Sequence, residues 1–186
     1  MKDYKDTVAV ITGAGRGIGR GIALRCAKEG MKVVLAGFGM ESLTKTAADL
    51  KALGAETLIV QTDGSRVEQV EDLAAATVEA FGQVDLLVNK AGAAGPGKTL
   101  ELTLDDWNWI MGVNFYGVLY GLRVFVPRMI KREQPSHVVN VLILKHLIDW
   151  SDSRCTTCGC AVPLPVRRCL RRAMDTHYQS SEAAEA

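Results

Sequence analysis

Short apolar runs alternate along this chain with longer segments whose apolar residues repeat at helical spacing. The first run, at residues 8–11, is rich in β-branched side chains and predicts a buried strand. Apolar residues then recur at helical spacing from Ile18 to Cys26, and we expect Gly30 to end that helix. The beginning of the chain therefore predicts a strand, a turn and a helix in succession.

The same alternation continues as far as residue 142. It predicts further strands at residues 32–36, 56–62, 84–88 and 137–142, and further helices at residues 41–53, 65–81 and 104–132. Ser65 with Glu68 forms a candidate capping box, and Thr103 with Asp106 is spaced as another N-terminal cap. Strands joined through helices form right-handed crossovers, so we predict an α/β fold, a doubly wound parallel sheet of Rossmann type.

One apolar stretch, from Trp109 to Val126, approaches the length that spans a membrane. Asn114, Arg123 and three glycines interrupt it. We therefore interpret it as a buried helix rather than a membrane segment.

The turn after the first predicted strand carries the strongest motif, the glycine-rich run Thr12–Gly19. Gly13 permits a tight turn, Gly17 lets the backbone approach a pyrophosphate, and Gly19 lets helix and strand pack closely. The helix that follows offers unpaired N–H groups to phosphate oxygens. The candidate cofactor-binding residues in this turn are Gly13, Gly15, Arg16, Gly17, Ile18 and Gly19. The alternative is a glycine-rich connection that binds nothing. The strand before the turn and the helix after it favour the binding site over this alternative.

Composition and charge narrow the classes of partner. Of 186 residues, 48% are hydrophobic, which is enough for one domain with a core. Lys and Arg number 22 against 21 Asp and Glu, so a net charge of +1 gives nucleic-acid binding no support. The first six residues carry charges of both signs, and the apolar run after them is too short for a signal-peptide core. We expect a cytoplasmic protein without membrane attachment.

Four motifs in the same order resemble the short-chain dehydrogenases/reductases: Thr12–Gly19, Asp63, Asn89–Gly92 and Asn114–Gly117. The resemblance covers about residues 5–141 and is highly specific, because it requires all four motifs in sequence. It implies a Rossmann-type NAD(P)-binding domain over residues 1–142. It also implies an oxidoreductase that transfers hydride between nicotinamide and a small alcohol or carbonyl substrate.

The resemblance also assigns roles to single residues. Asp63 would accept a hydrogen bond from the adenine amino group, and Asn114 would be the active-site asparagine that holds a water in the proton relay. Asn89, Ala91 and Gly92 would support the sheet and line the nicotinamide ribose.

Two of these residues have structural alternatives. Asp63 could merely begin a turn, and Asn114 could be a structural amide that bonds its own helix. Lys90 departs from the asparagine usual at its position, and it places a long cation beside the pocket.

The choice between NAD and NADP depends on the end of the second strand. No acidic residue follows Ala36 until Glu41, so nothing there repels a 2′-phosphate. Arg16 in the glycine-rich turn could pair with that phosphate, which favours NADP slightly over NAD. Alternatively, Arg16 is a solvated charge common to both cofactor classes, and Phe38 stacks on the adenine of either.

The family's chemistry needs a serine after the fifth strand, then a tyrosine and a lysine four residues apart. The expected serine position, three after Asn140, is Ile143, and the expected tyrosine and lysine fall near Thr156 and Cys160. The residues four positions after the chain's four tyrosines are Val8, Tyr120, Val124 and Glu182. The last lysine is Lys145, so the sequence as it stands supplies no Tyr-x3-Lys pair.

Residues 143–186 do not continue the strand and helix pattern. They contain four of the chain's five cysteines with a cluster of arginines, and we expect a divergent, poorly ordered tail from a shifted reading frame, an alternative exon or a sequencing error. Cys155, Cys158, Cys160 and Cys169 could ligate zinc, but a second paired spacing is lacking, so we expect free thiols and no metal.

Three hypotheses of function remain. The chain is a working NAD(P)-dependent oxidoreductase, a nucleotide-binding remnant without turnover, or a truncated product that does not fold stably. The family is homo-oligomeric and uses the long helix around Tyr116–Val126, together with a helix that we do not find here. We therefore expect an incomplete interface and an exposed apolar face.

Overall fold

The structure is a computed structural model that describes residues 4–95 and 101–141. The predictions for residues 143–186, including the tail, the cysteine cluster and the missing Ser, Tyr and Lys, lie outside the described residues. The order of elements is β1 (Val8–Thr12), α1 (Gly17–Lys28), β2 (Lys32–Gly37), α2 (Met40–Ala52), β3 (Thr57–Gln61), α3 (Val67–Phe81), β4 (Leu86–Asn89), α4 (Leu104–Met111), the π-helical turn η2 (Gly112–Tyr116), α5 (Gly117–Lys131) and β5 (His137–Asn140).

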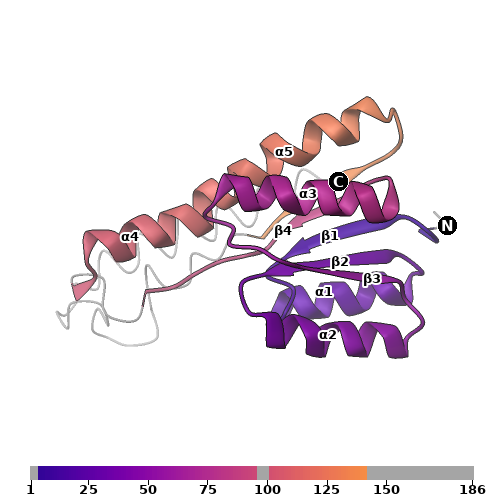
Figure 1. The fold of residues 1–186 in the computed structure, drawn as a ribbon, viewed down its shortest axis with the longest axis horizontal. Helices are drawn as coiled ribbons and strands as arrows, with labels where there is room; N and C mark the ends of the chain where they lie inside the picture. The colour runs from indigo at the N-terminus through magenta and orange to yellow at the C-terminus, as the bar shows by residue number, and fades with distance from the viewer. Residues whose placement is uncertain (1–3, 96–100, 142–186) are drawn as a thin grey trace, which may run out of the picture. The chain divides into compact units, whose positions relative to one another are not determined.

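The five described strands form one parallel sheet in the order β3-β2-β1-β4-β5. The chain builds outward from β1 through β2 to β3, then crosses back to place β4 on the other side of β1 (Figure 1). This order confirms the doubly wound parallel sheet. It also places the point where the strand order reverses between β1 and β4, the place where such sheets bind ligands.

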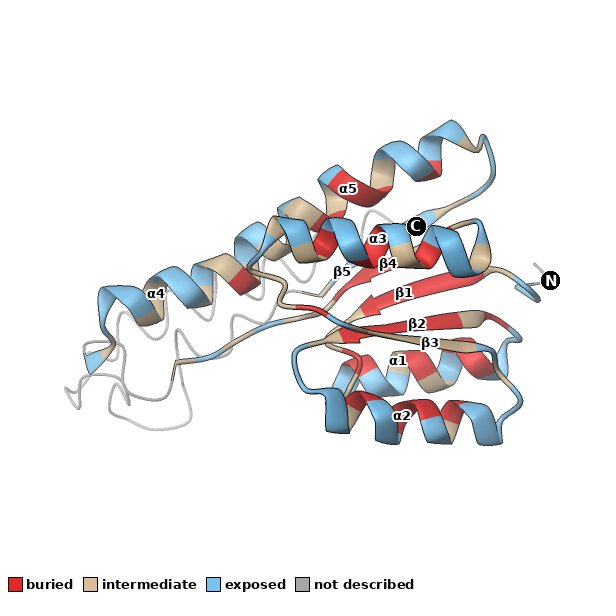
Figure 2. Cartoon of the chain, viewed as in Figure 1, coloured by how far each residue is buried: buried red, intermediate tan, exposed pale blue. Residues whose placement is uncertain are grey.

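One hydrophobic cluster covers each face of the sheet. Both clusters contain residues of β1, because successive side chains of a strand point to opposite faces. Ala9 and Ile11 face the cluster that includes residues of α1 and α2, whereas Val8 and Val10 face the cluster with residues of α3 and α5. Figure 2 shows the resulting buried band along β1, β2 and the inner faces of the helices. A strand buried on both faces is apolar at every position, which is why residues 8–11 form a continuous hydrophobic run.

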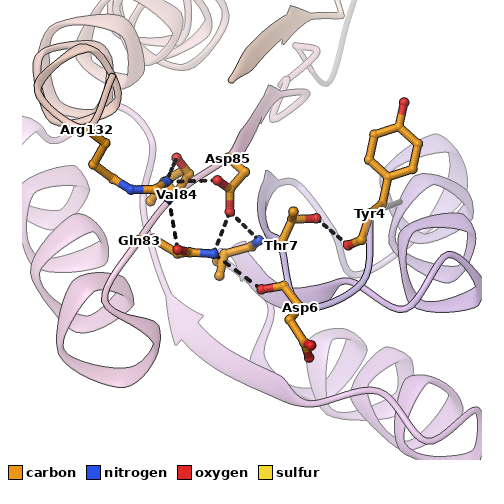
Figure 3. A network of polar contacts seen from close by, with 8 residues as sticks. Tyr4, Asp6, Thr7, Gln83, Val84, Asp85 and Arg132 are labelled. Atoms are coloured by element: carbon orange, nitrogen blue, oxygen red, sulfur yellow. Dashed lines mark hydrogen bonds and ion pairs between the residues drawn. The ribbon is translucent and has the colours of Figure 1, made fainter. Parts of the chain in front are cut away.

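A buried carboxylate holds the amino ends of the strands together (Figure 3). Asp85 Oδ2 accepts hydrogen bonds from the Val8 backbone N–H at 2.8 Å and from Gln83 Nε2 at 2.9 Å. Asp85 Oδ1 pairs with Arg132 Nη1 at 2.8 Å, and Arg132 Nη2 donates to Gln83 Oε1 at 2.9 Å. The network therefore joins β1, the start of β4 and the end of α5.

The predicted capping box of Ser65 and Glu68 is wrong. Helix α3 begins at Val67, and its N-cap residue Arg66 makes no side-chain capping bond. Ser65 lies one residue before the N-cap, in a turn where its hydroxyl donates to Asp63 Oδ1 at 2.7 Å.

The second cap is confirmed. The Asp106 N–H donates to Thr103 Oγ1 at 3.2 Å, and Asp106 Oδ2 accepts from the Thr103 N–H at 2.9 Å. The Thr103 bonds lower the pKa of the Asp106 carboxyl below its usual value.

Elements α4, η2 and α5 form one continuous helical stretch, Leu104–Lys131, in which the π-helical turn was not predicted. By length and composition, this helix of the described part of the chain is long enough and apolar enough to cross a membrane. Only 22% of its most apolar window is buried, so the prediction of a buried helix is wrong for most of its length. The stretch is one-sided, and α5 buries Gly121, Val124, Phe125 and Met129 while α4 buries none. The cytoplasmic location remains a prediction.

Candidate functional site

The glycine-rich turn between β1 and α1 has a backbone that side chains would disrupt. Gly13 and Gly17 adopt positive φ angles of 66° and 55°. A Cβ on Gly19 would lie 2.2 Å from the Gly13 carbonyl oxygen. The absence of a side chain at Gly19 therefore lets α1 rest directly on the turn, as the motif predicts.

The N-terminus of α1 has no capping side chain. Its N-cap residue, Arg16, makes no side-chain hydrogen bond to the first turn, and that turn contains no acidic residue. Among the described residues, the first N–H groups of the helix therefore lack a side-chain partner, and they carry the positive end of the helix dipole. Arg16 and Ile18 are exposed beside them. Such a site fits a phosphate or diphosphate group.

Thr12 connects the carboxyl ends of β1 and β4. Its Oγ1 accepts hydrogen bonds from the backbone N–H groups of Lys90 at 2.9 Å and Ala91 at 3.0 Å, and donates to the Val88 carbonyl at 3.3 Å. Gly92 follows, exposed, in the loop after β4. Sequence reasoning gave Thr12 no role of its own; its position directly before the first glycine is the signal that could have suggested one.

Two residues of α2 pack against the glycine-rich turn, and the sequence analysis missed both. The Thr46 hydroxyl is buried and lies 3.2 Å from the Gly15 carbonyl oxygen. A Cβ on Gly15 would meet Ser42 Oγ at 2.2 Å. The close contact between Gly15 and α2 explains why glycine is needed there, and only the folded chain brings these residues together.

Asn89 lies at the end of β4, 2% exposed. Its Nδ2 donates to Asn140 Oδ1 at 2.9 Å, which links β4 to β5. Its Oδ1 has no hydrogen-bond partner among the described residues. A Cβ on Gly121 would come within 2.3 Å of that oxygen, so α5 approaches Asn89 closely.

Asp63 begins a turn after β3, as its structural alternative predicted. Its Oδ1 accepts from both the backbone N–H and the hydroxyl of Ser65, at 2.9 and 2.7 Å. Its other oxygen, Oδ2, lies 4.0 Å from Arg66 Nε. The turn does not use Oδ2, which leaves the adenine-binding role of Asp63 a prediction.

Asn114 lies in the π-helical turn and fastens the loop that follows β4. Its Oδ1 accepts from the Ala93 N–H at 2.7 Å and its Nδ2 donates to the Ala93 carbonyl at 2.9 Å. The amide therefore bonds a loop distant in sequence rather than its own helix, contrary to the structural alternative. Its role in a proton relay stays a prediction. Single π-helical turns occur often at functional sites.

The end of β2 carries no carboxylate aimed at the turn. Gly37 closes the strand, Phe38 is 76% exposed, and Glu41 pairs with Lys45 at 2.7 Å on the surface of α2. A Cβ on Gly37 would make only ordinary contacts, 3.6 Å and longer.

One cavity at the carboxyl ends of the strands gathers part of the predicted site. Its lining includes Thr12, Gly13, Gly37, Asn89, Ala91 and Gly117. Asp63 and Asn114 do not line it. Within residues 4–95 and 101–141, no group of three or more His, Cys, Asp or Glu side chains could hold a metal ion.

A doubly wound sheet with a glycine-rich turn at an uncapped helix defines a dinucleotide-binding fold. The family model for short chain dehydrogenase matches residues 7–144, which is more than half of the chain. The chain belongs to the short-chain dehydrogenase/reductase family.

Curated relatives agree with this assignment. The chain is 38% identical over 149 residues to a CLA biosynthesis dehydrogenase/reductase of Lactiplantibacillus plantarum, a match that covers 80% of this chain and 52% of the relative. It is 39% identical over 142 residues to a C alpha-dehydrogenase of Sphingobium sp., which covers 76% of this chain and 47% of that protein. The chain thus spans about half the length of these relatives.

Solved structures with bound cofactor resemble the chain as well. A short-chain dehydrogenase/reductase from Burkholderia phymatum in complex with NAD is 46% identical, with a TM-score of 0.72 over 75% of this chain and 50% of that chain. A metagenomic short-chain oxidoreductase in complex with NADP is 31% identical, with a TM-score of 0.70 over 75% of this chain and 63% of that one.

Proposed function

We propose that this chain binds a nicotinamide dinucleotide at the turn between β1 and α1, as an oxidoreductase of the short-chain type. The proposal rests on the close approach of α1 to the Gly13 carbonyl at Gly19, which places an uncapped helix N-terminus at the point where the strand order reverses. Relatives of the same fold bind NAD and NADP. The family reaction would transfer hydride between the nicotinamide and an alcohol or carbonyl compound.

For the chain as its sequence stands, we expect cofactor binding without turnover. The family's acid/base chemistry needs a tyrosine whose phenol pKa a nearby lysine lowers, and no tyrosine in this sequence has a lysine four residues later. This observation favours the nucleotide-binding remnant among the three hypotheses. The prediction is tested with a panel of alcohols and carbonyl compounds, on which we expect no rate above background.

We further propose a preference for NADP over NAD. Gly37 offers no carboxylate to the ribose 2′-OH, and the nearest acid along the chain, Glu41, is paired with Lys45. Arg16 is exposed beside the turn and is available to a 2′-phosphate.

The decisive experiment is a titration of the full chain with NADH and NADPH, followed by nicotinamide fluorescence and by the shift in Tm. We expect saturable binding that the substitution Gly19→Ala abolishes, because its Cβ would collide with the Gly13 carbonyl.

Gly21→Ala is the matched control, since it adds the same methyl group to the same helix where nothing lies within 4 Å. We expect this variant to bind as the unaltered chain does, with a helix stabilised by up to about 1 kcal/mol. Equal binding by the Gly19 and Gly21 variants would contradict the proposed site. No binding by the unaltered chain would contradict the function.

A further inference from the structure

The geometry points to Lys90 as a second cation of the cofactor site, one that contacts the diphosphate shared by NAD and NADP. This inference rests on the proposed function. It assigns a role to the residue at which the chain departs from the asparagine usual in its family.

Lys90 is held over the glycine-rich turn from the side of β4. Its backbone N–H donates to Thr12 Oγ1 at 2.9 Å, which fixes the start of the side chain at the end of β1. Its Cδ lies 3.3 Å from the position of a Cβ on Gly13, so its alkyl chain runs against the first glycine. The stem is half-buried, and the ammonium group lies close enough to Arg16 for the two charges to interact.

The positive charge of Lys90 has no ion-pair partner in the described part of the chain. Burial, and to a smaller extent repulsion by Arg16, lowers the pKa of Lys90 from its ordinary value. No carboxylate of residues 4–95 or 101–141 forms an ion pair with Lys90 or Arg16. Two cations beside an uncapped helix N-terminus would repel each other less once an anion lay between them.

The position of Lys90 favours the diphosphate over the 2′-phosphate of NADP. Lys90 follows β4, whereas Gly37, the expected neighbour of the ribose 2′ position, ends β2 on the opposite side of β1. The diphosphate of a dinucleotide crosses the end of β1 at the turn itself. Lys90 lies over this turn, so the contact is expected with both cofactors.

The test compares Kd values of the full-length Lys90→Met variant for NADH and NADPH with those of the unaltered chain. Methionine keeps the aliphatic part of the side chain and removes the charge. We therefore expect the Kd values for NADH and NADPH to rise by the same factor, about tenfold. Lys90→Arg is expected to retain most of the affinity. Lys28→Met, at the far end of α1, is the matched control and should leave both Kd values unchanged.

Several outcomes overturn the inference. Unchanged Kd values for Lys90→Met, with an unchanged Tm of the free protein, would mean that the charge contacts no phosphate. A loss confined to NADPH would place Lys90 at the 2′-phosphate instead. A lower Tm with a loss that Lys90→Arg does not restore would mean a structural role only. Failure of the unaltered chain to bind either cofactor would overturn the proposed function, and this inference with it.

Discussion

Single glycines determine the shape of the candidate site because each marks a place where the backbone lies very close to a neighbouring segment. Gly13, Gly15 and Gly19 each lack a Cβ that would lie within 3 Å of a neighbouring atom. The sequence motif predicted the positions of these glycines. It could not predict the residues behind them, because Ser42 and Thr46 reach Gly15 only through the packing of α2 against α1.

The substitution Gly37→Asp tests the cofactor preference at this scale. A carboxylate at the end of β2 would repel a 2′-phosphate and accept hydrogen bonds from a ribose 2′-OH. We expect the Kd for NADPH to rise by at least about tenfold and the Kd for NADH to stay or fall, measured by the same fluorescence titration.

Gly37→Ala controls for the added Cβ, which meets only ordinary contacts, and should leave the ratio of the two Kd values unchanged. An unchanged ratio in Gly37→Asp would place the ribose elsewhere.

At the scale of elements, the hydrophobic period predicted every described strand and the sheet class, but it could not predict local competition between polar groups. Asp63 binds both the N–H and the hydroxyl of Ser65 in the turn before the helix, and α3 starts two residues after Ser65 with Arg66 as its N-cap. The sequence also could not predict the π-helical turn, because one extra residue per turn hardly changes the apolar pattern around Asn114.

The elements are held at the amino ends of the strands by Asp85, and Asp85→Asn tests how much this network stabilises the fold. The substitution removes the charge that pairs with Arg132, whose side chain is 28% exposed, while that of Asp85 is 11% exposed. Hydrogen bonds to a buried charge contribute about 2 kcal/mol, so we expect unfolding in urea at a clearly lower midpoint.

Asp49→Asn is the matched control. It breaks an ion pair with Arg20 whose partners are 44% and 45% exposed, and such surface pairs contribute at most about 1 kcal/mol. Equal shifts of the midpoint in both variants would show that the Asp85 network adds nothing beyond a surface pair.

At the scale of the molecule, the described residues expose several large apolar side chains along the long helix and at the last strand of the sheet. Phe115, Tyr116 and Leu119 are each at least 46% exposed along η2 and α5, and the four residues of β5 at the sheet edge are all exposed. The sequence analysis expected an exposed apolar face on the long helix, and this exposure agrees with it. Whether the chain folds stably in solution therefore becomes the central question for the whole molecule.

The rate at which the Cys26 thiol is alkylated measures whether the chain is folded. It lies on the buried face of α1, where it is 6% exposed, and burial raises the pKa of its thiol to about 11. Alkylation requires the thiolate, which is abundant near pH 8 only when the pKa stays close to its ordinary value of about 8.5. In a folded chain we therefore expect iodoacetamide to modify Cys26 at least about a hundredfold more slowly in buffer than in concentrated guanidinium chloride.

Site-resolved mass spectrometry is needed for this measurement, because the other four of the five cysteines lie outside the described residues. The denatured sample supplies the intrinsic rate for the same peptide, so no variant is required. Slow modification would show that α1 packs on the sheet in solution, and a further decrease on adding NADPH would link this packing to cofactor binding. Equal rates in buffer and denaturant would mean that the chain does not fold stably, which is the third hypothesis.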